Sequence, residues 1–202
     1  ITEIADSLVS LQMADGGWNL SGAYSDADVT AMALQALSAV RSYGYEDNIQ
    51  KGVGRLASLQ KDDAGYASYG VNNSESTAQV LMALCALNID YRTDTRFIKN
   101  GHTVLDALMG YRTSKGAFSH TKDGKPNALA TTQALGALVC ADNYEKHGTF
   151  IYRYGNIQSR PVQKETQPDV KPSPEQPAKT EPHHSCDGSI AATEHTLSLI
   201  HI

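Results

Sequence analysis

Lysine and arginine form no cluster in this 202-residue sequence, and acidic residues outnumber them by 22 to 17, which gives a formal net charge of −5. A protein that binds the phosphates of nucleic acid or an anionic membrane surface normally carries a basic patch. The sequence also lacks any run approaching the roughly 18 apolar residues of a membrane-spanning helix. We therefore expect no nucleic-acid partner and no membrane span in this chain.

Cysteine is scarce as well. The three cysteines, Cys85, Cys140 and Cys186, are odd in number and widely spaced, which fits neither a disulfide framework nor a metal-ligand pattern. Cys85 and Cys140 occur in alanine-rich apolar stretches, where we expect small buried thiols. His183 and His184 stand close to Cys186, but three such residues in a flexible tail define no ligand geometry. We predict no metal site and no cofactor.

What the sequence does contain is an internal repeat of about fifty residues, present three times in the first 140 residues. Each copy begins with a short apolar helical pattern, at residues 8–12, 56–60 and 105–109. A turn with an aromatic residue follows, and these aromatics are Trp18, Tyr66 and Phe118. Each copy ends in a Thr-x-x-x-Leu-x-Ala-Leu stretch that begins at Thr30, Thr77 or Thr131. Self-similarity at this period indicates an array of helical hairpins.

The repeat predicts an all-α fold of about three helical hairpins in two layers. The second helix of each copy is apolar nearly all round, as in a helix enclosed by neighbours, whereas the first helix is apolar on one side. The helix N-caps are expected at Asp28, at Ser74 or Ser76, and at Thr131. In the third copy, Met109 replaces the glutamine found at Gln12 and Gln60.

Composition changes abruptly after about residue 159. Six of the seven prolines lie between Pro161 and Pro182, among lysine, glutamate and glutamine, and such a segment cannot build a core. We therefore place the repeat domain at residues 1–155 and a disordered Pro/Lys/Glu-rich linker at residues 156–185. Residues 186–202 are expected to be unstructured, and their last seven residues resemble translated sequencing-adapter sequence.

Residues 12–18, Gln-Met-Ala-Asp-Gly-Gly-Trp, resemble the Gln-Trp motif of the squalene-cyclase and protein-prenyltransferase superfamily. Residues 28–37 resemble the inner helix that follows this motif, and the likeness recurs three times over about residues 1–150. The resemblance implies an α/α toroid, with an inner ring of helices around a cavity and an outer ring around both. Three hairpins correspond to about half of such a ring, which implies a partial toroid. Residues 26–37 and 97–101 look most like repeat domains of exported surface proteins from Gram-positive gut bacteria, which implies an extracellular or cell-surface location.

One activity of this superfamily has a partial match. Class II terpene cyclases carry an Asp-x-Asp-Asp-Thr-Ala motif whose middle aspartate protonates an alkene, and residues 26–31 match it except at Val29. As a cyclase, the chain would use Asp28 as the general acid with support from Asp26, and the turn aromatics would stabilise carbocations. The alternative is that Asp28 caps the helix and Asp26 is a favourable charge at its N-terminus. Because Val29 replaces the last acid, we favour capping.

Two other activities of toroid proteins lack their residues here. Protein prenyltransferases need an aspartate, a cysteine and a histidine around zinc, but no cysteine lies at ligand spacing from His102 or His120. Thioester domains need a Cys-Gly-Glu-Gln sequence, which is absent. For His120 we expect an exposed loop, with a position at a cavity mouth as the alternative.

We therefore predict a non-catalytic module that binds a small molecule or a surface partner, with the cyclase as the alternative. A second alternative is corrinoid binding, because residues 30–33, Thr-Ala-Met-Ala, are similar to inner-helix phrases of cobalamin carriers. The expected ligand-binding residues are the turn aromatics and polar residues near the inner-helix starts: Trp18, Thr30, Tyr66, Glu75, Thr77, Phe118, Thr131 and Gln133. For the aromatics, packing within each hairpin is the competing interpretation.

Overall fold

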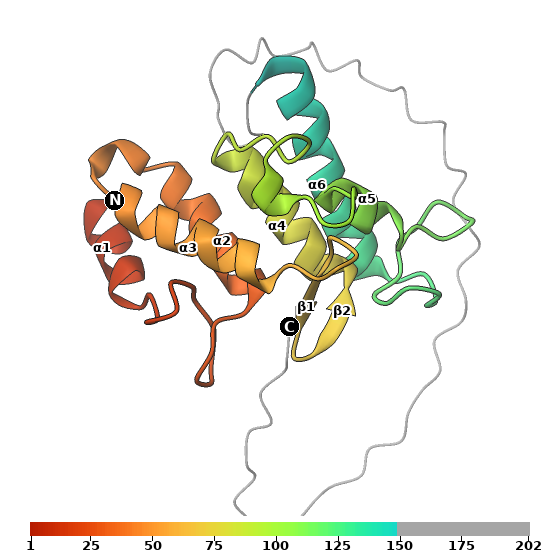
Figure 1. Cartoon of the computed structure of the whole chain (residues 1–202), viewed down its shortest axis with the longest axis horizontal. Coiled ribbons are helices and arrows are strands. Elements are labelled where there is room, and N and C mark those ends of the chain that lie inside the picture. Colours follow the sequence, from red (N-terminus) through yellow and green to blue (C-terminus); the bar gives the residue numbers. More distant parts are fainter. Residues whose placement is uncertain (149–202) are drawn as a thin grey trace, which may run out of the picture. The chain divides into compact units, whose positions relative to one another are not determined.

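The computed structural model describes residues 1–148, which are mostly helical, as predicted (Figure 1). Its helices are α1 (Thr2–Ser10), α2 (Ala27–Ser38), α3 (Glu46–Leu59), α4 (Ser74–Ala86), α5 (Val104–Met109) and α6 (Ala128–His147). Two short strands, β1 (Tyr66–Ser68) and β2 (Val71–Asn73), and two 3-10 turns, η1 (Arg41–Tyr43) and η2 (Thr95–Phe97), complete the elements. The predicted linker, the predicted end and residues 149–155 of the predicted repeat domain lie outside the described residues.

The helices of residues 1–148 are arranged in two layers. The inner layer consists of α2, α4 and α6, and α4 contacts both of the others. The outer helices α3 and α5 pack against α2 and α4 respectively, so each covers the inner helix that precedes it in the chain (Figure 1).

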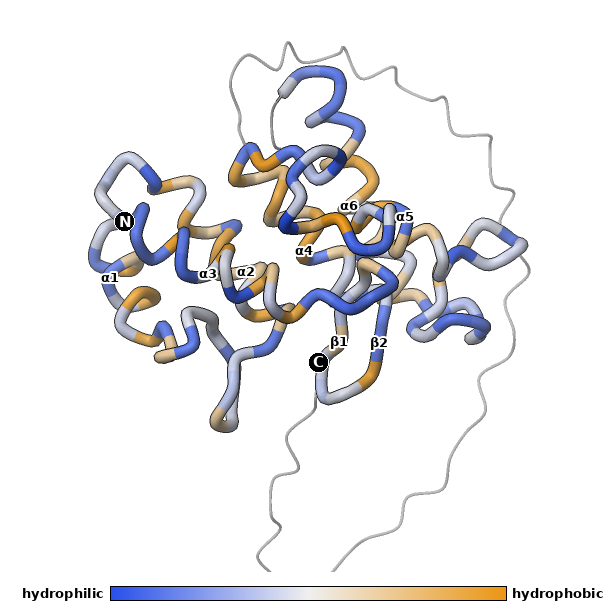
Figure 2. Tube along the Cα trace, viewed as in Figure 1, coloured by the Kyte–Doolittle hydropathy of each residue, from blue (hydrophilic) through white to orange (hydrophobic). Residues whose placement is uncertain are grey.

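The core lies between these layers. Every residue of α4 except Gln79 is buried, because neighbours flank this helix on several sides. Leu34 of α2 and Leu81 of α4 are among the fully buried side chains, each of which contributes about 1.5–3 kcal/mol by leaving water. The hydrophobic colouring in Figure 2 is concentrated in the helices, whereas the loops between α5 and α6 are mostly hydrophilic.

Each Gly-aromatic turn is joined to its inner helix by the same hydrogen bond. In every copy the backbone N–H of the aromatic residue donates to the hydroxyl oxygen of the repeated threonine. The pairs are Trp18 with Thr30 at 2.9 Å, Tyr66 with Thr77 at 3.1 Å, and Phe118 with Thr131 at 3.0 Å. In the first two units this bond is buried, so the amide has no access to water and depends on the threonine hydroxyl as its acceptor.

A second set of bonds joins each of the first two turns to the next unit. The side-chain amides of Gln12 and Gln60 each donate to one carbonyl in their own turn and to one in a later segment. Backbone hydrogen bonds that recur in all three turns place Arg112 at the equivalent position of the third copy. The prediction that Met109 stands at the glutamine position is therefore wrong, because Arg112 occupies that position.

The all-α prediction missed the β1–β2 hairpin. Its two central residues, Tyr69 and Gly70, both have positive φ angles, of 47° and 80°. Two-residue hairpin turns require this conformation, and Asn-Gly or Asp-Gly is the usual sequence signal. Because tyrosine rarely adopts a positive φ, residues 69 and 70 do not match the usual signal for such a turn.

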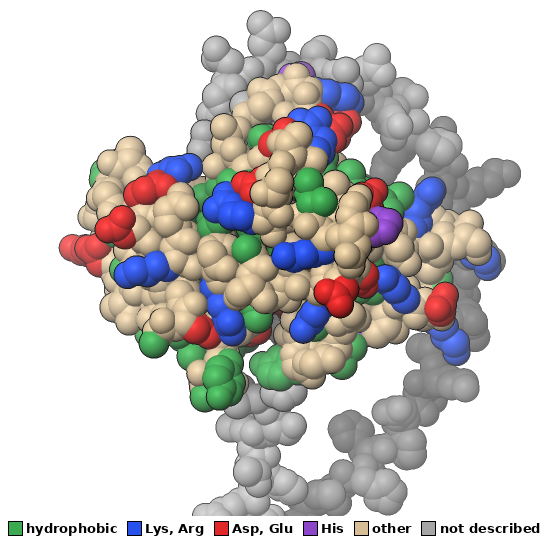
Figure 3. Space-filling view, viewed as in Figure 1, with side chains coloured by type: hydrophobic (Ala, Val, Ile, Leu, Met, Phe, Trp, Pro, Cys, Tyr) green, Lys and Arg blue, Asp and Glu red, His purple; other side chains and the backbone are tan. Residues whose placement is uncertain are grey.

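No helix of the described part is long and apolar enough to cross a membrane, in agreement with the sequence-based expectation. Figure 3 shows lysine and arginine interspersed with aspartate and glutamate on the face in view. That face has no continuous basic patch.

Replacing Thr77 by valine tests the threonine bond. The substitution keeps the shape of the side chain but removes the acceptor for the Tyr66 N–H, so we expect a loss of about 1–3 kcal/mol in the free energy of unfolding. Urea denaturation measures this loss. The control is Thr132→Val, because the exposed Thr132 hydroxyl donates only to a carbonyl of its own helix. Equal losses in the two variants would contradict the structural role of Thr77.

Candidate functional site

The N-caps of the three inner helices are not the residues expected from the sequence. The side chains of Asp26, Asn73 and Asn127 accept hydrogen bonds from the backbone N–H groups three residues later, at 2.9, 2.7 and 2.9 Å. The caps predicted at Asp28, at Ser74 or Ser76, and at Thr131 are therefore wrong, because each of those residues lies inside the first turn of its helix. Capping does not occupy the Asp28 carboxyl group.

Asp28 and Glu75 occupy equivalent positions, two residues before the repeated threonine, at the starts of α2 and α4. Burial raises the pKa of Asp28 above the 3.8 of an unperturbed aspartate, and the nearby Asp26 and Glu75 carboxyl groups raise it further. Ser76 and His120 act in the opposite direction, but burial outweighs them. An acidic pair thus lies at one end of the inner layer.

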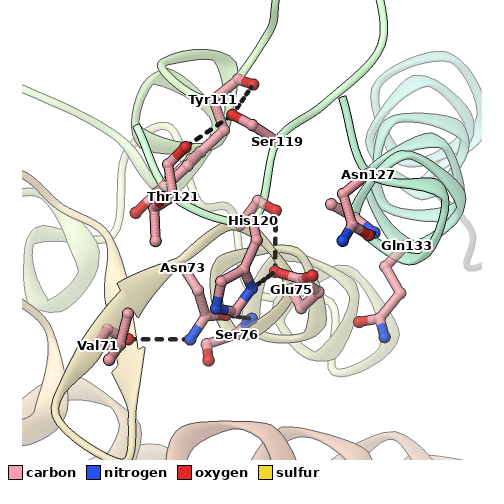
Figure 4. Close-up of polar contacts among 12 residues, drawn as sticks. Val71, Asn73, Glu75, Ser76, Tyr111, Ser119, His120, Thr121, Asn127 and Gln133 are labelled. Atoms are coloured by element: carbon pink, nitrogen blue, oxygen red, sulfur yellow. Dashed lines mark hydrogen bonds and ion pairs between the residues drawn. The ribbon is translucent and has the colours of Figure 1, made fainter. Parts of the chain in front are cut away.

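His120 reaches this pair from the loop between α5 and α6. Its Nδ1 atom lies 2.9 Å from Glu75 Oε2, and its backbone carbonyl accepts a hydrogen bond from the Ser74 N–H at 3.0 Å. Figure 4 shows the His120 ring pointing toward Glu75. The His120 side chain is half exposed, in agreement with the expected loop position, while Glu75 is buried. We call Asp28, Glu75, Ser76 and His120 the acidic cluster.

Two polar atoms of the acidic cluster are buried without a well-formed hydrogen bond. They are Asp28 Oδ1 and the hydroxyl oxygen of Ser76, which is itself a fully buried residue. The Ser76 hydroxyl is close enough to lower the pKa of Asp28, yet its geometry satisfies neither atom. Most buried polar atoms in folded proteins have a partner, so these two mark a place where a bound group could supply one.

A row of glutamines crosses the inner layer. Gln35 Nε2 donates to Gln79 Oε1 at 2.9 Å, and Gln79 Nε2 donates to Gln133 Oε1 at 3.1 Å. The row links α2, α4 and α6, and all three side chains are partly exposed. Sequence reasoning identified Gln133 alone. Gln79 could have been found with it, since both follow the repeated threonine by two residues.

The other predicted ligand-binding residues take part in packing or in holding the turns. The aromatic residues of the three turns, Trp18, Tyr66 and Phe118, are buried and leave no open ring face for a ligand. The threonines Thr30, Thr77 and Thr131 use their hydroxyls to hold those turns. The structure therefore favours the packing interpretation of the aromatics, and of the predicted ligand-binding set it leaves Glu75 and Gln133 as polar groups of the inner layer.

The described residues offer neither a metal-binding group nor a reactive thiolate. No group of three or more histidine, cysteine, aspartate or glutamate side chains within residues 1–148 is placed to hold a metal ion. Burial raises the pKa of the Cys85 thiol to about 12, which disfavours the reactive thiolate at neutral pH. Cys85 and Cys140 are both buried, as predicted. What the cluster offers is hydrogen-bond acceptors and a carboxyl group on Asp28 whose pKa is raised by burial.

The raised pKa of Asp28 predicts a pH-dependent effect of the Asp28→Asn substitution. A carboxyl group with a higher pKa in the folded protein than in the unfolded chain destabilises the fold when it is ionised. Relative to wild type, Asp28→Asn should therefore gain stability as the pH rises from about 3 through the folded-state pKa, and then stay constant. Urea denaturation across this range measures the difference. Asp123→Asn, in an exposed turn, is the control. A pH-independent difference for Asp28→Asn would contradict the burial of this carboxyl.

Comparison with known proteins adds no assignment. No protein-family model matches the chain, and no curated protein sequence is significantly similar to it.

Proposed function

We propose that the chain is a non-catalytic helical-repeat module that binds a ligand at the acidic cluster. The observation that carries this proposal is the pair of buried atoms, Asp28 Oδ1 and Ser76 Oγ, that lack a well-formed hydrogen bond. Leaving a buried polar group unsatisfied costs about 1–3 kcal/mol. Capping of α2 and α4 is done by Asp26 and Asn73, so it does not account for these groups.

The charge of the cluster favours an organic cation as the ligand. Three carboxyl groups, those of Asp26, Asp28 and Glu75, act on the same region, with His120 as the opposing group. A positive group placed there would stabilise the ionised form of Asp28 and lower its pKa, so binding and proton release would be coupled. An ammonium or guanidinium group would also donate hydrogen bonds to the unsatisfied oxygens.

We further propose that the module belongs to an α/α toroid of the squalene-cyclase and protein-prenyltransferase type. The support is the resemblance of the repeated segments together with the packing of each outer helix on the preceding inner helix. The glutamine row and the acidic cluster would then face the cavity of the ring. An extracellular or cell-surface location, and membership of an exported bacterial surface protein, follow from the resemblance alone.

The cyclase alternative is favoured by one observation, the raised pKa of Asp28, which suits a general acid. The turn aromatics do not support it, because they are buried and cannot stabilise a carbocation at the cluster. The corrinoid alternative has less support. Of residues 30–33, three are buried in helix packing and only Met32 is exposed.

Calorimetry with spermidine and agmatine tests the binding proposal. We expect heat of binding to the full chain, and at least about a tenfold loss of affinity in Asp28→Asn and Glu75→Gln, because each removes a carboxylate from the cluster. Asp123→Asn is the matched control and should bind like wild type. Absence of heat with both cations, or equal affinities in all variants, would contradict the proposal.

Incubation with squalene separates the module from the cyclase. We expect no cyclised product by mass spectrometry from the full chain. A product that disappears in Asp28→Asn would establish the cyclase and overturn the non-catalytic function. Calorimetry with cobalamin tests the corrinoid alternative: we expect no heat, whereas heat of binding would support that alternative.

A further inference from the structure

The three repeat units follow one packing rule. An inner helix fills the groove between the outer and inner helices of the next unit: α2 contacts both α3 and α4, and α4 contacts both α5 and α6. The contact between α2 and α3 is close, since a Cβ added to Gly52 of α3 would lie 2.9 Å from Leu34 Cδ2. The rule leaves two faces without a partner among residues 1–148, one on α6 and one between α1 and α2.

The open face of α6 is apolar. Leu135 follows the repeated threonine by four residues, as Leu34 and Leu81 do in the first two units. Leu34 and Leu81 are fully buried, whereas Leu135 is 61% exposed. Val139, one turn further along α6, is also exposed, although its equivalents Ser38 and Cys85 are buried. This face has the composition of a covered helix face but no cover among the described residues.

The groove between α1 and α2 is the counterpart. Counted back from the equivalent turn positions, Ile4 of α1 corresponds to Gly52 of α3 and Val104 of α5. Both equivalents are buried, whereas Ile4 is 76% exposed. The groove is apolar and has a volume of about 130 Å³, and its lining residues are Ile1, Ile4, Ala5, Leu8, Ala36, Leu37 and Val40. In the next two units the equivalent grooves are filled by α2 and α4.

We propose that a second copy of this chain supplies the missing partner, with α6 of one copy seated in the α1–α2 groove of the other. The two faces are different from each other and complementary, so the contact is head-to-tail. It continues, across two chains, the packing that the repeat already uses twice within one chain. This self-association surface lies apart from the acidic cluster and does not depend on the proposed ligand.

Two substitutions test the two faces separately. Leu135→Lys places a charge on the α6 face, and Ile4→Lys places one in the groove. Because burying an unpaired charge is costly, each should weaken self-association of the full chain by at least about tenfold. Sedimentation equilibrium measures the association constant, and circular dichroism verifies that each variant is folded. Leu135→Ser and Ile4→Ser replace any lysine variant that does not fold. The control is Leu20→Lys, which alters an equally exposed apolar residue in a loop away from both faces.

A mixture of the two lysine variants distinguishes the head-to-tail contact from a symmetric one. The Ile4→Lys copy keeps its α6 face and the Leu135→Lys copy keeps its groove, so together they can form one intact interface. We expect each variant alone to be monomeric and the mixture to contain a two-chain complex. A wild-type chain that stays monomeric up to about 100 μM would overturn the proposal. The proposal would also be overturned if only one of the two lysine variants weakened self-association. The same holds if the mixture of the two variants formed no complex.

Discussion

The hydrogen bond from the turn aromatic to the threonine of the inner helix is the interaction on which the rest of the structure depends. It recurs in all three units, with donor–acceptor distances from 2.9 to 3.1 Å. The bond fixes the direction in which the chain leaves the turn and enters the inner helix, while burial of the aromatic side chain packs the outer helix against the layer. The hydroxyl sets the backbone path of each unit, and the aromatic side chain contributes to its packing.

This bond also determines which residues are available for function. In the first two units the threonine holds the turn and the residue four positions before it caps the helix, whereas the residue two positions before it takes part in neither bond. In the first two units that position carries Asp28 and Glu75. In the third unit it carries the exposed Leu129, so the acidic pair is confined to α2 and α4. The three units thus share the same turn and cap, but only the first two carry an acidic residue at this position.

The inner helices could be predicted from the sequence, but the roles of several individual residues could not. Periodic apolar positions identified the inner helices, because burial requires that pattern whatever the function. The same pattern could not tell whether Trp18 packs or binds a ligand, since both uses place an aromatic after the turn. Nor could it choose between Asp26 and Asp28 as the cap, which depends on the exact first residue of α2. The His120–Glu75 contact spans 45 residues and follows from tertiary packing alone.

The pKa of Asp28 depends both on the burial of this side chain in the fold and on the proposed binding of a cation beside it. A carboxyl-detected NMR titration of Asp28, with and without spermidine, measures both effects. The account predicts a pKa above 3.8 for Asp28 in the protein alone, because of burial, and a decrease when the cation binds beside it. An Asp28 that titrates like an exposed aspartate, and does so equally with and without spermidine, would contradict it.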